Sequence, residues 1–186
     1  MNANLYDYLW KSYQSFTHSK VIPFIQGSKK VLDVGCGTGT LLSKLGPDVH
    51  KVGLDPSKKM VERADKKVNG EILLGNAEQL PSDSYDAIIS SSALHRYQDV
   101  EMFLEQARSR LNKNGKVVIL DWDAVFPYTI LYRLYKLLDR DIQGLKNADQ
   151  VANITRIKGF GVESYHVYHC WTWRFFLLVL KPTLNS

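Results

Sequence analysis

VLDVGCGTGTLL, residues 31–42, is the stretch of this sequence that decides its fold. Its first four residues have the composition of a short buried strand, and three glycines follow within residues 35–39. Glycine allows a sharp turn at the end of a strand, and without a Cβ it lets a ligand approach the backbone closely. The stretch therefore predicts a strand, a ligand-binding turn and a helix over 38–46, in that order.

The spacing of the glycines argues against two common nucleotide ligands. In the dinucleotide fingerprint GxGxxG, the third glycine counted from Gly35 falls at position 40, which is Thr40 here. The GxxxxGK[ST] spacing of phosphate-binding loops and its lysine are also missing. Asp55 ends the next predicted strand, where a carboxylate can accept hydrogen bonds from both ribose hydroxyls and repels a 2′-phosphate. The ligand that remains compatible with these residues carries a ribose but no pyrophosphate.

Composition predicts a single soluble domain over residues 1–186, of which 45% are hydrophobic and 23% charged. The longest apolar run, FFLLVL at 175–180, is far shorter than the roughly 18 residues of a membrane-spanning helix, so no transmembrane segment is expected. The polar, aromatic N-terminus does not resemble a secretory signal, and the two cysteines fit a reducing cytoplasm. No Cys/His cluster with metal-ligand spacing occurs, so no metal is expected.

The net charge of +5 and the pI near 9.1 raise the question of a nucleic-acid partner. The densest basic group lies within residues 58–67, with Glu62 and Asp65 between its members. That pattern is typical of a solvated helix face, so nucleic acid is disfavoured as a partner. The expected oligomeric state is a monomer or a homodimer.

Strand and helix alternate along residues 28–122. Strands are predicted at 31–35, 51–55, 85–94 and 116–122, with a short strand and loop over 71–81. Helices are predicted at 38–46, 56–68 and 99–115. This alternation predicts a Rossmann-like α/β fold, a mostly parallel sheet with helices on both faces. Residues 1–27 read as a helical segment of one or two helices, interrupted at Pro23.

Residues 123–186 break this alternation. Helices are predicted at 125–140 and 147–159, followed by two strands, VESYHVYHC and WTWRFFLLVLK, with almost no room between them. A parallel crossover needs a dozen or more residues, so this final pair must be antiparallel. The whole pattern predicts seven strands, mostly parallel, with a C-terminal antiparallel pair.

Four motifs in order resemble those of class I S-adenosylmethionine-dependent methyltransferases. They are VLDVGCGTG (31–39), LDPS (54–57), GNAEQLPSDSYDAIISSSALH (75–95) and LNKNGKVVILD (111–121). The resemblance covers roughly residues 28–121 and is strongest to the small-molecule group, including the quinone-biosynthesis methyltransferases. It implies S-adenosyl-L-methionine as cofactor, S-adenosyl-L-homocysteine as product and in-line transfer of a methyl group.

The resemblance also implies a cofactor site. The residues expected to hold the methionine part are Asp33, Gly35, Cys36, Gly37 and Gly39. Those expected around the ribose and adenine are Asp55, Pro56, Met60, Asn76, Ala77 and Glu78. Asn76 stands where the family usually has aspartate, although its amide oxygen can still accept from the adenine amino group. For Cys36 only the backbone need contact ligand, and for Glu78 a solvent-facing position is the alternative.

Ser91, Ser92 and His95 follow the fourth strand, at the carboxyl edge where open α/β sheets bind ligands. The resemblance places His95 near the cofactor and the acceptor, as a candidate catalytic residue; a cap or packing role is the alternative. A general base is needed only if the acceptor must lose a proton. The resemblance further suggests that Tyr8 and Tyr13 close over the cofactor, with core packing as the alternative.

The acceptor is expected to be a small molecule. The chain has SSSA at 90–93 where methylases of adenine amino groups carry [ND]PP[YF], and it lacks a Pro-Cys nucleophile. The alternatives are an RNA or protein methyltransferase and a non-catalytic cofactor-binding protein. The acceptor pocket is predicted between the N-terminal segment, Trp122 and the aromatic helix 125–140, which would cap an apolar acceptor unless it is an ordinary buried helix. Neither His18 nor His50 belongs to a recognisable pattern.

Overall fold

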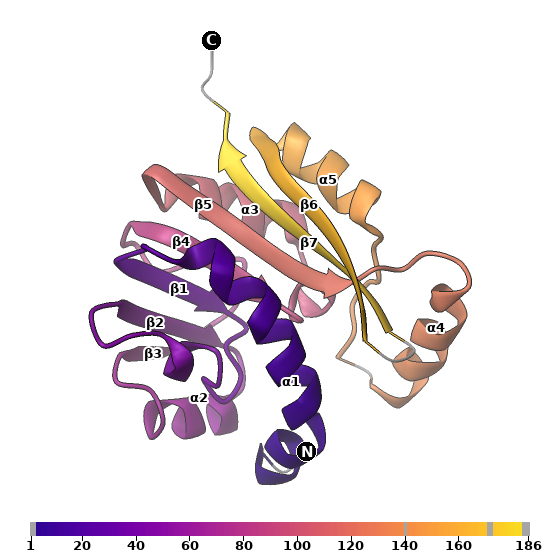
Figure 1. Ribbon diagram of the computed structural model, residues 1–186, viewed down its shortest axis with the longest axis horizontal. Helices are drawn as coiled ribbons and strands as arrows, with labels where there is room; N and C mark the ends of the chain where they lie inside the picture. Colours follow the sequence, from indigo (N-terminus) through magenta and orange to yellow (C-terminus); the bar gives the residue numbers. More distant parts are fainter. Residues whose placement is uncertain (1–2, 140, 171–172, 184–186) are drawn as a thin grey trace.

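The computed structural model describes residues 3–139, 141–170 and 173–183, with side chains from residue 11 onward except those of residues 131, 135 and 138. The described chain forms one seven-stranded sheet in the order β3-β2-β1-β4-β5-β7-β6 (Figure 1). The strands are β1 (Lys30–Val34), β2 (His50–Asp55), β3 (Glu71–Leu74), β4 (Tyr85–Ser91), β5 (Leu111–Trp122), β6 (Phe160–Cys170) and β7 (Trp173–Pro182). The pairs among β1 to β5 are parallel, and β7 is antiparallel to both β5 and β6. The predicted α/β architecture is confirmed.

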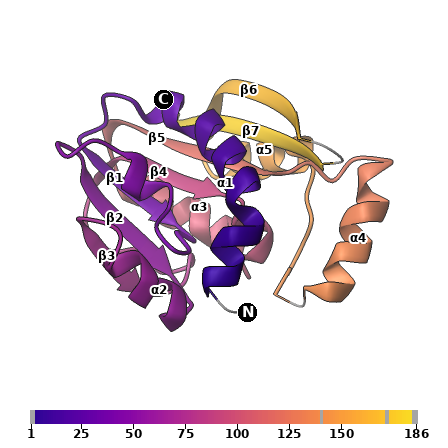
Figure 2. The same cartoon turned by 60° about the horizontal axis from the view of Figure 1, so that its bottom comes forward.

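Helices cover both faces of the sheet. They are α1 (Ala3–Ile25), α2 (Lys58–Asp65), α3 (Val100–Ser109), α4 (Tyr128–Leu138) and α5 (Ala148–Ile157). α3 and α5 pack on one face through Phe103 and Val151, and α1 packs on the other through Val21 and Ile25. Figures 1 and 2 show α1 crossing the sheet and α4 standing away from it beyond the end of β5.

The central strand β4 shows why both faces are covered. Ala87, Ile88 and Ile89 are all fully buried, and Ile88 contacts one apolar core while its two neighbours contact the other. Because side chains alternate across a strand, three consecutive apolar residues need a cover on each side. Polar side chains that bind a ligand are therefore placed at the strand ends.

The helix predicted over 38–46 is wrong. Only a short 3-10 turn, η1 (Leu42–Lys44), forms there. Gly39 has a φ of +72°, outside the helical region, so no helix begins before it. Pro47 disfavours the helical conformation at the residue before it, which limits the turn from the other side.

Two further boundaries differ from the prediction. α3 ends at Ser109 rather than at 115, because Leu111 already pairs with Tyr85 and begins a long β5. β4 ends at Ser91 rather than at 94, because Ser92 has a φ of +57° and cannot continue a strand.

The N-terminal segment forms one helix, α1, which is one of the two alternatives that the sequence left open. Pro23 lies in its last turn, so its missing N–H removes one backbone hydrogen bond without dividing the helix. Tyr8 belongs to α1, but its side chain lies outside the described part of the structure. Among the described helices, none has the length and apolar character needed to cross a membrane.

Candidate active site

The glycine loop is held against β2 by its own backbone. The N–H groups of Gly35 and Cys36 donate to the carbonyl of Leu54 at 2.7 and 3.1 Å. A Cβ on Gly35 would lie 2.5 Å from Cβ of Ala93, and one on Gly39 would lie 2.6 Å from Cγ2 of Val68. These two glycines allow neighbouring segments to pack closely.

Gly37 differs from the other two glycines of the loop. Its φ is +55°, and a Cβ built there would meet no atom within 4 Å. The residue lines a hollow that opens to solvent. A side chain at this position would therefore point into the hollow and not into the protein core. Glycine leaves that space open, so a ligand can approach the backbone closely.

The hollow lies between α1 and the carboxyl edge of β1 and β4. The predicted site residues that line it are Tyr13, Asp33, Gly35, Cys36, Gly37, Ser91 and Ser92. Lining residues that the sequence analysis did not identify are Gln14, Thr17, His18, Thr38, Thr40 and Leu41. Apart from the expected Tyr13, the lining residues of α1 carry no motif, so the sequence did not indicate that they face the loop.

Asp33 presents a buried carboxylate to the hollow. The residue is 3% exposed, and of the described residues none donates a hydrogen bond to it. Burial, together with the nearby carboxylate of Asp55, raises the pKa of Asp33 to about 7. A cationic ligand group beside it would favour the ionised form and satisfy this carboxylate.

Asp55 lies directly behind the loop. Its Oδ2 accepts from the N–H of Gly37 at 2.8 Å and its Oδ1 from the N–H of Ser57 at 2.9 Å. Burial raises the pKa of Asp55, while these two hydrogen bonds and Arg96 oppose that shift. Each carboxylate oxygen retains a second lone pair, so the residue can still accept from ribose hydroxyls.

The residues predicted around adenine lie outside the hollow. Pro56 and Asn76 are exposed, Met60 is half-buried and Ala77 is buried. The carboxylate of Glu78 accepts from the backbone N–H groups of residues 98 and 99 at 2.9 and 3.0 Å, just before α3. Their role in binding adenine stays a prediction.

Cys36 contributes its backbone to the turn, and its side chain is 8% exposed. Burial, with the carboxylates of Asp33 and Asp55 nearby, raises the pKa of its thiol far above the ordinary value. The neutral thiol is a poor nucleophile, so the side chain acts as a small residue of the loop.

His95 forms a buried pair with Asp121. The ring Nδ1 lies 2.7 Å from Oδ1 of Asp121, whose Oδ2 accepts from the backbone N–H of His95 at 3.0 Å. The ring also stacks on Trp122 at 4.4 Å, with planes 8° apart. Nε2 is buried and makes no hydrogen bond within the described structure. The sequence analysis did not identify Asp121 as a site residue. It lies near the end of β5, on the edge of the sheet where ligands bind.

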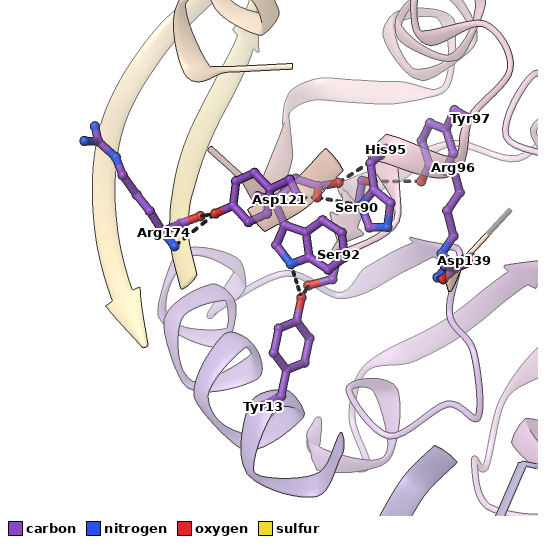
Figure 3. A network of polar contacts seen from close by, with 11 residues as sticks. Tyr13, Ser90, Ser92, His95, Arg96, Tyr97, Asp121, Asp139 and Arg174 are labelled. Carbon is purple, nitrogen blue, oxygen red and sulfur yellow. Dashed lines mark hydrogen bonds and ion pairs between the residues drawn. The ribbon is translucent and has the colours of Figure 1, made fainter. Parts of the chain in front are cut away.

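Hydrogen bonds join Tyr13, which lines the hollow, to Ser92 (Figure 3) and to the indole on which His95 stacks. Nε1 of Trp122 donates to the hydroxyl of Tyr13 at 3.0 Å, and that hydroxyl donates to Oγ of Ser92 at 2.8 Å. Ser92 keeps its left-handed φ at this position, a conformation that serine rarely adopts outside constrained sites. Tyr13 therefore links the wall of the hollow to the ring on which His95 stacks.

The residues present fit an S-adenosylmethionine-type cofactor. Gly37 leaves room for a ligand against the backbone, and Asp33 offers a buried carboxylate to a cation. Asp55 has accepting capacity left for a ribose.

Known proteins agree with this assignment. A family model described as a methyltransferase domain matches residues 10–165, most of the chain. The demethylmenaquinone methyltransferase of Thermotoga maritima is 37% identical over 99 residues, which cover 50% of this chain and 43% of that protein. The chain thus matches less than half the length of this relative.

Two solved structures share the fold. The methyltransferase of Haloferax volcanii, solved in complex with the Trm112 methyltransferase activator, superimposes with a TM-score of 0.84 at 17% identity and covers 98% of this chain and 96% of its own. The magnesium protoporphyrin IX methyltransferase of Synechocystis, solved with bound S-adenosylhomocysteine, gives a TM-score of 0.71 at 19% identity and covers 90% and 82%.

The sheet order, the glycine loop and the family match lead to one conclusion: the chain belongs to the methyltransferase domain family, with the class I methyltransferase fold. The dependence on S-adenosylmethionine that the motif resemblance implied is confirmed at the level of this family.

Proposed function

We propose that this chain transfers a methyl group from S-adenosylmethionine to a small-molecule acceptor. The observation that carries the proposal is the hollow beneath α1, where the open side of Gly37 and the buried carboxylate of Asp33 meet the end of β4. The named small-molecule methyltransferases among the similar proteins support this acceptor class.

The cofactor, when bound, would supply a methyl group that is bonded to a positively charged sulfur. The methyl carbon is open to in-line attack, because the sulfur leaves as a neutral thioether. The chain's own residues would hold it from three directions. Asp33 would pair with the ammonium group, Asp55 would accept from the ribose hydroxyls, and Gly37 would admit the ligand against the backbone. Holding two reactants in alignment is the main contribution a protein can make to such a displacement.

His95 is the residue proposed to remove a proton from the acceptor. The carboxylate of Asp121 binds the Nδ1 side of the ring, which leaves Nε2 as the nitrogen able to accept a proton. Asp121 would be a positioning residue, because it acts through His95. This arrangement favours an acceptor whose reacting atom carries a hydrogen, such as a hydroxyl or an amine.

The acceptor would enter beside Tyr13 and Trp122, under α4. The buried Tyr132 of α4 stacks on Trp122 at 5.5 Å and on Trp173 at 5.3 Å. Its hydroxyl donates to the backbone carbonyl of Arg174 at 2.6 Å, so this tyrosine anchors the helix. Ile130 and Leu134 lie on an exposed face, so α4 is not an ordinary buried helix.

Calorimetric titration with S-adenosylhomocysteine, with NAD as the control ligand, tests the proposal. We expect micromolar binding of S-adenosylhomocysteine, its loss in Asp55→Ala, and no binding of NAD. A screen of radiolabelled methyl transfer to phenols, amines and quinols would follow, with RNA included at low and high salt. Binding of NAD in place of S-adenosylhomocysteine would refute the proposed function.

A further inference from the structure

α4 and the residue just before its start carry an exposed apolar surface. It consists of Phe126, Ile130, Leu134 and Leu137, which are 81, 56, 57 and 76% exposed. Four of the nine large hydrophobic side chains that the described structure exposes therefore lie in this short segment. The three within α4 follow each other at intervals of four and three residues, which places them on one face of the helix. A gathered apolar surface of this kind marks an interaction site.

The opposite face of α4 attaches the helix to the protein. Tyr132 is buried and stacks on Trp122 and Trp173, and the half-buried Tyr128 packs against the same apolar core. At 100° per residue, Tyr132 lies roughly opposite Ile130 around the helix. Figure 2 shows α4 standing away from the sheet. The apolar surface is therefore not the face by which α4 packs on the described protein.

The charges of α4 itself are positive. The helix contains Arg133 and Lys136, both exposed, and no acidic residue. Arg133 lies three residues after Ile130 and four before Leu137, so it borders the apolar surface. Nζ of Lys136 donates to the carbonyl of Gln143 at 3.2 Å and has two further hydrogens. An apolar face bordered by cations is typical of helices that lie on anionic membranes.

Acidic residues follow α4, but a cation outside the helix pairs with them. Asp139 and Asp141 lie 2.5 and 3.7 Å from the guanidinium of Arg96, which follows β4. They are thus partly neutralised, and they stand beyond the last residue of the helix. The chain as a whole has a net charge of +5, which attracts it to anionic surfaces.

A second copy of this chain would fit the apolar surface less well. In a symmetric dimer the same patch meets itself, so the two copies of Arg133 and Lys136 would approach each other. α4 contains no acidic residue to offset that repulsion. An anionic lipid surface complements both the apolar residues and the cations.

We propose that the apolar surface of α4 docks on an anionic lipid membrane. Phe126, Ile130, Leu134 and Leu137 enter the interface, and Arg133 and Lys136 lie at the level of the lipid phosphates. Docking goes beyond the proposed function. One consequence rests on that function: because the inner face of α4 stacks on Trp122, docking would bring the acceptor entrance next to the bilayer.

Flotation of the full chain with lipid vesicles tests the inference. One set of vesicles is phosphatidylcholine alone, and the other contains about a quarter phosphatidylglycerol, which is anionic. Leu134→Gln/Leu137→Gln makes the apolar surface polar. Its matched control, Met102→Gln/Ile157→Gln, changes two exposed apolar residues on α3 and α5. Thermal unfolding of each variant shows whether it is folded, and all are expected to be, because the substitutions are at exposed positions.

A second pair of variants tests the charges. Arg133→Glu/Lys136→Glu reverses the cations of α4, and Lys58→Glu/Lys59→Glu reverses two exposed cations at the start of α2. Both variants change the net charge of the chain by the same amount. A difference between them therefore reports the position of the charges and not their sum.

We expect the wild type to bind anionic vesicles at least about tenfold more strongly than neutral ones, and more weakly as salt is added. Leu134→Gln/Leu137→Gln should lower binding about tenfold or more, while its control stays within about twofold. Arg133→Glu/Lys136→Glu should lose more binding to anionic vesicles than Lys58→Glu/Lys59→Glu does.

Failure of the wild type to float with anionic vesicles would overturn the inference, and so would equal losses in a variant and its matched control. Equal binding to both kinds of vesicle would also overturn it. A wild-type dimer in light scattering that dissociates in Leu134→Gln/Leu137→Gln would identify a second copy as the occupant instead. The measurements need neither cofactor nor acceptor, so they are independent of the proposed function.

Discussion

The carboxylate of Asp121 binds His95 twice, at Nδ1 of the ring (2.7 Å) and at the backbone N–H (3.0 Å). Two contacts from one carboxylate fix both the position of the residue and the direction of its ring. The stacked indole of Trp122 holds the ring plane from one side. A histidine held in this way has Nδ1 occupied by the carboxylate, while its buried Nε2 has no hydrogen-bond partner in the described structure.

The most direct effect of Asp121→Asn should be on which ring nitrogen of His95 carries the hydrogen. In the wild type we expect the neutral ring to carry its hydrogen on Nδ1 and not on Nε2, because the carboxylate can only accept. Two-bond ¹H–¹⁵N NMR of the ring nitrogens measures this directly and needs no acceptor. With an acceptor in hand, turnover should fall by about a hundredfold while cofactor affinity stays unchanged. A wild-type ring protonated on Nε2 would contradict the assignment.

Gly37→Ala and Gly39→Ala should separate ligand binding from folding. A methyl group on Gly39 would overlap Val68, so we expect a loss of more than about 2 kcal/mol in the free energy of unfolding. At Gly37 only the left-handed backbone opposes the change, at roughly 1–2 kcal/mol. Denaturant unfolding and calorimetry together should show Gly37→Ala folded but unable to bind S-adenosylhomocysteine. A folded Gly37→Ala that binds normally would place the ligand elsewhere.

Asp33→Asn should stabilise the ligand-free protein while weakening cofactor binding. Burial raises the pKa of Asp33 from 3.8 to about 7, so the folded state binds a proton more tightly than the unfolded state does. The wild type therefore loses stability as the pH rises from about 4 to about 7, and the loss is complete above that range.

The stability difference between Asp33→Asn and the wild type should vanish near pH 4 and reach up to about 4 kcal/mol at pH 8. Urea unfolding at both pH values measures it. The affinity of the wild type for S-adenosylhomocysteine should fall as the pH drops below about 7, since a protonated carboxyl cannot pair with the ammonium group. Stability that does not depend on this substitution at pH 8 would contradict the expectation.

Ser92→Gly and Ser92→Ala test the strained residue at the end of β4. Both lose the hydrogen bond from the Tyr13 hydroxyl, which is worth about 1 kcal/mol. Only glycine relieves the left-handed φ of +57°, by roughly 1–2 kcal/mol. We expect Ser92→Gly to be more stable than Ser92→Ala by about that amount in thermal unfolding. Equal stabilities would show that the conformation at this residue carries little strain.

The regular part of this fold was readable from local pattern. The apolar strands, the short connections between them and the turn after Val34 depend on neighbours in sequence, so the sheet was predicted correctly. The helix after the loop was predicted wrongly, because the left-handed Gly39 prevents a helix from beginning there and only a 3-10 turn forms.

The residues of the candidate site also fall into two groups, those that the sequence indicated and those that only the structure showed. The sequence by itself determined the glycine loop, Asp33, Asp55 and the position of His95 after β4, because strand ends and turn residues are local signals. Only the tertiary structure decided that Asp121 orients His95 and that His18 faces the loop. Those contacts join residues from distant parts of the chain, and their meeting depends on how α1 and β5 pack on the sheet.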